Sequence, residues 1–450
     1  MTEDLSALPA LVRFLPGFIK RRIAKRPNLV KILDNIGWLF FDKILRMGVG
    51  LIVGVWVARY LGPEQFGLFN FAAAFVGMFG AVAGLGLQGI VVRDLVREPS
   101  SKAEILGSAA ALQLVSGFVA YGLILVTIFW LRPDDALAKT IVAILGSTML
   151  FKASEVAVCW FESQVLSKFT VWVQNGTFFV FATVKAALIL QGAPLVAFAW
   201  VTMAEGLAVA LIMLIVLSVG GPQARRLRVT RVRIKALLKE SWPLLLSGVS
   251  VVIYMKIDQI MLGQMIGDGS VGIYSVAARL SEIWYIIPVI VVSSVFPSLA
   301  RQHEKSSEVF LKNLQKLYEF LIKSAFIACV FVTFFSEEII NFVFGNAYQD
   351  SAIVLSFHVW SGIFVFFGTA WSKWIILEGL QSVALKMHLL SLVSNICLNF
   401  VLIPLYGAVG AAVATTISYA LGHTLFMLIF PSQKTAVKMF WKSFSLNNFL

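Results

Sequence analysis

The chain has 450 residues, of which 59% are hydrophobic and only 14% are charged, and its mean hydropathy is +0.86. That is more apolar surface than a water-soluble core of this length can bury, so the composition excludes a soluble globular protein and indicates an integral membrane protein. The apolar runs do not alternate with polar residues as the strands of a transmembrane barrel do, so we expect an all-α protein.

The N-terminal segment, residues 1–35, mixes basic and apolar residues. This pattern is typical of a basic amphipathic helix that lies on the membrane surface. A cleaved signal peptide would have a short apolar core followed by a cleavage site of small residues, but here a full-length span follows. We therefore expect the N-terminus to be retained in the cytoplasm.

Twelve apolar stretches follow, each long enough to cross about 30 Å of hydrocarbon. They are residues 36–61, 66–92, 105–131, 137–163, 169–191, 194–219, 242–266, 271–298, 317–344, 352–379, 383–404 and 407–430. The only sizeable break, the basic stretch 220–241, predicts a cytoplasmic linker between an N-terminal lobe (36–219) and a C-terminal lobe (242–430). An even number of spans also places the tail, 431–450, in the cytoplasm.

The distribution of basic residues supports this topology. The outer loops carry only Arg59, Arg132 and Lys139, whereas the segments predicted to be cytoplasmic carry most of the other Lys and Arg residues. This asymmetry is the positive-inside pattern, and it accounts for most of the net charge of +13 without a nucleic-acid partner.

The two lobes share an internal repeat. Offsets of 205 and 215 residues align Gly62 with Gly267, Gly67 with Gly272, and Gly192 with Gly407. Glycine suits turns between closely spaced helices because it takes positive φ at little cost. Since each repeat has six spans, both halves enter the membrane from the same side. The sequence therefore predicts a parallel pseudo-two-fold repeat with a binding site between the lobes.

Several other patterns carry no chemistry in this context. The cysteines (Cys159, Cys329, Cys397) and histidines (His303, His358, His388, His423) are scattered, so we expect packed or interfacial side chains and no metal or cofactor site. The glycine-rich stretch 84–89 lies inside an apolar span, which favours close helix packing over dinucleotide binding. The outer loops are too short for a soluble catalytic domain, so we do not expect an enzyme.

Ionisable residues inside the spans are the candidate functional groups. A central Arg, Lys or Asp costs about 2.5–3.5 kcal/mol on insertion scales, so this many of them implies a shared, wet interior. We predict that five basic residues line a substrate-binding cavity: Arg46, Lys152, Lys256, Arg279 and Lys373. Five acidic residues are candidates for coupling or gating: Asp42, Glu155, Glu205, Asp258 and Glu282.

Helical spacing also allows purely structural ion pairs. Asp42 and Arg46 are four residues apart, and Lys152 with Glu155 and Arg279 with Glu282 are three apart. For Lys152 and Glu155 a structural pair explains the pattern as well as a functional one. Lys185 can instead extend its ammonium group toward the outer membrane surface.

Several stretches carry a family resemblance. They are Trp38, Asp42 and Arg46 leading into Val57–Gly67, then Lys256–Gly263, Gly272–Leu280, Val295–Pro297 and Tyr406–Ala412. Over nearly its whole length the chain resembles the polysaccharide-transporter family, in the superfamily that also contains multidrug antiporters and the lipid II flippase. The two additional spans that are usual in lipid II flippases are absent.

The resemblance implies twelve spans in two lobes around a cationic cavity, in the bacterial cytoplasmic (inner) membrane. It also implies a flippase that moves undecaprenyl-diphosphate-linked oligosaccharide repeat units outward by alternating access, for O-antigen, capsule or exopolysaccharide synthesis. A glycan polymerase and a chain-length regulator are the possible protein partners. The alternatives are a cation-coupled multidrug antiporter, whose cavity should be dominated by acidic groups, and a membrane glycan polymerase or ligase, which should have long outer loops.

Overall fold

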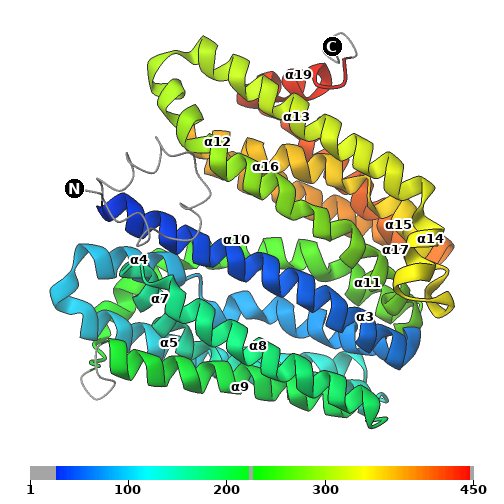
Figure 1. Cartoon of the computed structure of the whole chain (residues 1–450), viewed down its shortest axis with the longest axis horizontal. Helices are drawn as coiled ribbons and strands as arrows, with labels where there is room; N and C mark the ends of the chain where they lie inside the picture. Colours follow the sequence, from blue (N-terminus) through cyan, green and yellow to red (C-terminus); the bar gives the residue numbers. More distant parts are fainter. Residues whose placement is uncertain (1–26, 222–226, 446–450) are drawn as a thin grey trace, which may run out of the picture. The chain divides into compact units, whose positions relative to one another are not determined.

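The computed structural model describes residues 27–221 and 227–445 (Figure 1). Most of the predicted surface helix at 1–35 therefore lies outside the described residues. Within them every regular element is a helix and no strand occurs, so the prediction of an all-α membrane protein is confirmed.

The helices follow the predicted spans closely. The first half contains α3 (Pro27–Gly84), α4 (Gln88–Arg97), η2 (Pro99–Ser101), α5 (Lys102–Leu131), α6 (Ala136–Gly146), η3 (Ser147–Ser154), α7 (Glu155–Ser163), α8 (Ser167–Leu190) and α9 (Leu195–Gly220). The second half contains α10 (Arg231–Met265), α11 (Asp268–Glu282), η5 (Ile283–Tyr285), α12 (Ile286–Lys305), α13 (Ser307–Phe334), α14 (Ser336–Val343), η6 (Asn346–Tyr348), α15 (Ser351–His358), α16 (Ser361–Leu377), α17 (Gln381–His423), α18 (Leu425–Ile429), η7 (Pro431–Gln433) and α19 (Lys434–Lys442).

Ten helical segments of the described chain are long and apolar enough to cross a membrane. Two of them, Leu45–Arg97 and Gln381–Ile429, have 53 and 49 residues. At 1.5 Å per residue each is more than twice the thickness of the hydrocarbon core. Each also contains a glycine with non-helical backbone angles, Gly62 or Gly407. The ten segments therefore accommodate the twelve predicted spans.

Helix α17 folds back on itself at Gly407, whose φ is 55° and ψ is −131°. Asn395 Nδ2 donates a hydrogen bond of 3.4 Å to Ser418 Oγ across the two arms. A Cβ added to Gly410 would lie 2.1 Å from the carbonyl oxygen of Leu402. Residues eight apart in a straight helix are about 12 Å apart, so these contacts identify an antiparallel helical hairpin.

The aligned glycines of the repeat share their backbone conformation. Gly62 and Gly267 have φ values of 70° and 127°, and Gly192 and Gly407 have φ values of 68° and 55°. L-residues with side chains rarely adopt such angles, which explains why glycine stands at both copies of each turn.

The chain divides into two compact units. Unit 1 comprises the residues up to Val57 together with Val76–Val249, and unit 2 comprises Ala58–Phe75 and Ser250–Leu450. In unit 1, α8 and α9 run side by side (Figure 1). In unit 2, α16 packs against α13 and α17, with Phe367 and Trp371 almost fully buried. The predicted domain limits at 36–219, 220–241 and 242–430 stay predictions.

The second part of the predicted linker is helical and belongs to α10. Two ion pairs join it to α4 and to the residue that follows α4: Arg93 Nη1 lies 2.5 Å from Glu240 Oε1, and Arg233 pairs with Glu98. These contacts hold the first turns of α10 within unit 1, and of the linker's basic residues they neutralise Arg233.

Candidate functional site

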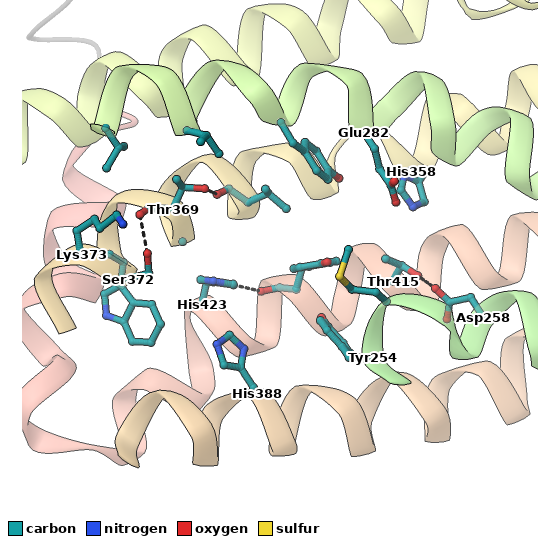
Figure 2. Close-up of a pocket in the computed structure, with 18 of the residues that line it drawn as sticks. Tyr254, Asp258, Glu282, His358, Thr369, Ser372, Lys373, His388, Thr415 and His423 are labelled. Atoms are coloured by element: carbon teal, nitrogen blue, oxygen red, sulfur yellow. Dashed lines mark hydrogen bonds between the residues drawn. The ribbon is translucent and has the colours of Figure 1, made fainter. Parts of the chain in front are cut away.

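Unit 2 contains a cavity of about 430 Å³ that is lined by residues of α10, α11, α12, α15, α16 and α17. Figure 2 shows Lys373, Ser372 and Thr369 at one end of this cavity, and Asp258, Glu282 and His358 at the other. Of the predicted site residues, the structure therefore brings Asp258, Glu282 and Lys373 to one cavity. The two acidic groups lie at the opposite end from the lysine.

Asp258 is held by three hydrogen-bond donors and is only 3% exposed. Tyr274 Oη donates to its Oδ2 at 2.8 Å, Thr415 Oγ1 donates to the same oxygen at 2.5 Å, and Asn399 Nδ2 donates to Oδ1 at 2.6 Å. The donors come from α11 and from both arms of the α17 hairpin. Three donors aimed at one carboxylate stabilise its ionised form.

A second layer of polar groups surrounds these donors. Asn399 Nδ2 also donates to Asn395 Oδ1 at 3.1 Å, and Tyr254 Oη lies 3.3 Å from Ser418 Oγ. Asn399 Oδ1 is buried and has no hydrogen-bond partner among the described residues. Buried polar atoms normally have a hydrogen-bond partner. Asn399 Oδ1 is therefore an acceptor beside the carboxylate that is available to a further ligand.

The chemistry of this cluster, the Asp258 cluster, follows from its donor set. No Lys or Arg in the described part of the chain forms an ion pair with Asp258. Carboxylate, amide and hydroxyl oxygens are the ligands that hard cations prefer. Burial disfavours the charged carboxylate and so opposes the effect of the three donors, which makes protonation a second way to neutralise this group. The arrangement is therefore able to hold a proton or a hard monovalent cation inside unit 2.

Sequence reasoning missed the partners of Asp258. Asn395 and Asn399 are four residues apart within an apolar run, which places both amides on one face of a span. Amides are among the polar groups that hydrogen-bond between membrane helices, so this pair was a usable signal. Nothing local in the sequence links it to a residue more than 130 positions earlier.

Three histidines that look unrelated in the sequence also line the cavity: His358, His388 and His423. His358 Nδ1 lies 2.9 Å from Ser281 Oγ, and His423 Nδ1 lies 3.0 Å from the carbonyl oxygen of Tyr419. The three histidines are scattered in the sequence but come together here, because α15 and the two arms of α17 converge on one space. His358 and His423 are buried, as expected for packed side chains.

Arg279 does not border this cavity and does not pair with Glu282, although the side chains of both residues are described. Its guanidinium instead lies over the ring of Phe66, 5.8 Å from the ring centroid, whereas Glu282 faces the cavity. Residues three apart differ by about 60° around a helix, which is enough to send the two side chains to different neighbours. The suggested Arg279–Glu282 pair is wrong in this structure.

Lys256 likewise lies outside the cavity lining. It is half-buried and precedes Asp258 by two residues, or about 200° around α10, so the two side chains leave the helix on nearly opposite sides. Lys373 does line the cavity, and its Nζ lies 5.6 Å from the ring centroid of Phe296.

The other predicted site residues belong to unit 1. Lys152 Nζ and Glu155 Oε1 form an ion pair at 2.6 Å, and Arg46 donates a hydrogen bond to Gln174. Lys185 Nζ lies 2.7 Å from Glu205 Oε2, so Lys185 does not simply extend to the surface. The side chain of Asp42 lies outside the described residues.

Comparison with known proteins identifies relatives along most of the chain. The sequence profile of a family described as polysaccharide biosynthesis protein matches residues 32–303, which is more than half of the chain. A probable low-salt glycan biosynthesis flippase, Agl15 of Haloferax volcanii, is 25% identical over 407 residues that cover 86% of this chain and 81% of the relative. The capsular polysaccharide biosynthesis protein CapF of Staphylococcus aureus is 25% identical over 36% of this chain and 41% of its own.

Solved structures show the same fold. The lipid II flippase MurJ in an inward closed conformation aligns with a TM-score of 0.73 at 17% identity, covering 91% of this chain and 90% of its own. An inward-facing multidrug resistance transporter of the MATE family aligns with a TM-score of 0.71 at 14% identity, covering 91% of this chain and all of its own. These likenesses concern the fold alone.

Proposed function

The chain belongs to the polysaccharide biosynthesis protein family, and from this premise we propose that it is a flippase that moves lipid-linked oligosaccharides across the membrane. The observation that carries the proposal is the match to Agl15, which runs along 86% of this chain and 81% of that flippase. The helices of residues 27–221 and 227–445 are joined by short segments, which suits a protein that moves a membrane-bound substrate.

In its specific form, the proposal assigns undecaprenyl-diphosphate-linked repeat units of O-antigen, capsule or exopolysaccharide as the substrate. The diphosphate and sugars of such a molecule cannot enter hydrocarbon without losing their hydration. Fixed Lys and Arg side chains replace that hydration, while the polyprenyl tail stays in the lipid. Outward movement of an anion from a negative cytoplasm gains about 2.3 kcal/mol per charge per 100 mV.

Arg46, Lys152, Lys256, Arg279 and Lys373 remain the proposed contacts of the diphosphate. Two of them have protein partners in this conformation: Lys152 is paired with Glu155, and Arg46 is bound to Gln174. In an alternating-access cycle these partners exchange for phosphate oxygens when substrate enters. Such an exchange makes the affinity for substrate differ between the two conformations of the transporter. A ligand can shift a conformational equilibrium only through such a difference.

The Asp258 cluster is the proposed coupling site. Binding of a cation or a proton there changes the charge of a buried group that joins α10, α11 and both arms of α17. Because this charge is buried, its neutralisation alters how these helices pack. Glu282 and Glu205 are proposed to act in gating.

The test is transport by the purified protein in liposomes that carry a fluorescent undecaprenyl-diphosphate oligosaccharide. We expect the label to become accessible to an enzyme on the opposite side of the membrane faster than in liposomes without protein. A membrane potential should accelerate this step. Equal rates with and without protein would refute the flippase. Export of cationic drugs in place of the glycan would support the antiporter alternative.

A further inference from the structure

A basic groove of about 510 Å³ lies between α13 and α19, and its lining shares no residue with the Asp258 cluster. Four lysines line it, two from each helix: Lys312 and Lys316, and Lys438 and Lys442. All four are exposed, and none forms an ion pair within the described residues. The lining also includes one carboxylate, Glu319, so the groove carries a net positive charge.

The two walls of this groove are fixed to one another. Gln315 Nε2 contacts Ser443 Oγ at 3.0 Å and the carbonyl oxygen of Met439 at 3.3 Å, and also donates to Glu319 Oε1 at 3.0 Å. On its inner side α19 buries Phe440, whose ring centroid lies 5.0 Å from that of Phe367 in α16. The four ammonium groups are thus held at a built surface and not on a free tail.

Exposed apolar side chains follow the lysines along the same helix, with the half-buried Lys323 between Phe320 and Ile327. Phe320 is 57% exposed, and further on Ile327, Phe331 and Phe334 line an apolar groove of about 560 Å³. Spacings of three, four and seven residues place these side chains on the face of α13 that carries Lys312 and Lys316. Lys316 and Ile327 are about 16 Å apart along the axis, close to the depth of one hydrocarbon leaflet.

Aromatic residues at the end of α19 complete the pattern. Trp441 is 61% exposed, and its ring centroid lies 6.2 Å from that of Phe444. Trp beside Lys at the end of an amphipathic helix is typical of the boundary between head groups and acyl chains. We therefore expect the lysines to lie at head-group depth, on the side predicted to be cytoplasmic.

We propose that the α13–α19 groove is a binding site for an anionic phospholipid. The four lysines hold its phosphate group or groups, and one acyl chain lies along Phe320 toward Phe331. The two pairs of lysines on opposite walls fit a head group with two phosphates better than one with a single phosphate. Each lysine near an anionic membrane surface adds to the affinity, and basic pockets on the cytoplasmic side of membrane helices bind such head groups.

The experiment measures lipid binding to the purified full chain by native mass spectrometry, with cardiolipin, phosphatidylglycerol and phosphatidylcholine as probes. For the variant that combines K312Q, K316Q, K438Q and K442Q, we expect the affinity for cardiolipin to fall at least tenfold and that for phosphatidylcholine to stay within twofold. Lys235, Lys239, Lys305 and Lys386 are also exposed, so the variant K235Q/K239Q/K305Q/K386Q removes the same number of charges and is the matched control. It should bind all three lipids like the wild type.

A second arm tests the acyl chain. The variant F320S/F331S should bind long-chain cardiolipin more weakly than the wild type does. Its affinity for a short-chain analogue of cardiolipin should be unchanged. Unchanged cardiolipin binding by the quadruple variant, an equal loss in the control, or an equal loss for phosphatidylcholine would overturn the site. Inorganic diphosphate that binds as tightly as cardiolipin would overturn the assignment to a lipid.

Discussion

Gly67 and Gly272, which occupy equivalent positions in the two repeats, make the same close contact with each other's segment. A Cβ on Gly67 would lie 1.7 Å from the carbonyl oxygen of Asp268, and a Cβ on Gly272 would lie 2.1 Å from that of Pro63. Pro63 and Asp268 are themselves equivalent at the offset of 205. Contacts that are reciprocal in this way are the signature of a local two-fold relation.

This contact predicts that G67A and G272A each destabilise the protein. The atoms in the way belong to the backbone, so the helices must separate, and overpacking of this kind typically costs about 1–3 kcal/mol. Thermal unfolding in detergent should show a lower midpoint for both variants. Gly77 is the control because a Cβ there meets nothing within 4 Å, and G77A should not lower the midpoint; equal midpoints for all three would contradict the interpretation.

Asp258 should control the ion dependence of transport. D258N places an amide NH2 group where the carboxylate accepts hydrogen bonds from Tyr274, Thr415 and Asn399, so the charge and part of the network are lost together. We expect transport by this variant to fall at least tenfold and to become insensitive to sodium and proton gradients. The measurement is the liposome assay with each gradient imposed in turn.

The control for Asp258 is Glu337, an exposed carboxylate on α14. E337Q should retain both the rate and its gradient dependence. If D258N responds to the gradients as the wild type does, the coupling proposal is wrong.

Arg279 tests the substrate contacts. A charge-assisted bond to phosphate is worth roughly 1.5–3 kcal/mol, so R279A should slow transport by about tenfold or more. R279K should recover part of the rate, because it keeps the charge but loses the two-pronged geometry. The comparison is surface polysaccharide in a host that lacks its own flippase, at matched protein levels.

The structure adds a discriminating control for Arg279. Its guanidinium lies over Phe66, so F66L removes the cation–π contact without touching the charge. Full activity of R279A would refute a substrate role. Loss of the R279A protein from the membrane, together with the same loss in F66L, would show that Arg279 acts by packing.

Glu378 predicts a pH dependence of stability. Its Oε1 lies 2.9 Å from His303 Nε2 and 3.0 Å from Trp374 Nε1. The hydrogen bond to His303 and, next, the one from Trp374 lower the pKa of Glu378 below its ordinary value. A carboxyl group with a lowered pKa in the folded state stabilises the protein above its ordinary pKa, and this contribution is lost as the pH falls through the folded value.

The expected result is that the wild type unfolds at a higher temperature than E378Q at neutral pH, and that this difference shrinks below about pH 4. H303Q is the informative companion because the other half of the chain has a glutamine in a similar contact, where Gln88 Nε2 donates to Glu162 Oε2 at 3.1 Å. H303Q should therefore keep most of the stability. A difference between wild type and E378Q that does not change with pH would contradict the prediction.

The sequence was sufficient for the helices and turns because those depend on local properties. Span length and the aligned glycines at positions 62, 192, 267 and 407 follow from hydropathy and from allowed φ values. The cavity in unit 2 depends on which helix faces meet. Thr415 and Asn399 approach Asp258 from more than 130 residues away, and Lys185 meets Glu205 across two neighbouring helices.

Helical spacing predicted ion pairs correctly only in part. It was right for Lys152 and Glu155, which form the expected pair, and wrong for Arg279 and Glu282. A spacing of three residues allows two side chains of one helix to touch. Whether they do so depends on what the neighbouring helix offers as an alternative contact. For Arg279 the alternative contact is the ring of Phe66, which comes from the other repeat.

The α17 hairpin has a consequence for how the chain enters the bilayer. Its two arms carry Asn395 and Ser418, which hydrogen-bond to each other across the Gly407 turn. A single span that left the translocon with these amides and hydroxyls exposed to lipid would bear the cost of unsatisfied polar groups. If the two arms insert together, their polar side chains hydrogen-bond to each other and fewer of them are exposed to lipid without a partner. We therefore expect both arms to insert into the membrane together. A glycosylation-mapping assay can compare chains truncated at residues 405 and 430. The first arm alone, in the chain ending at residue 405, should insert poorly.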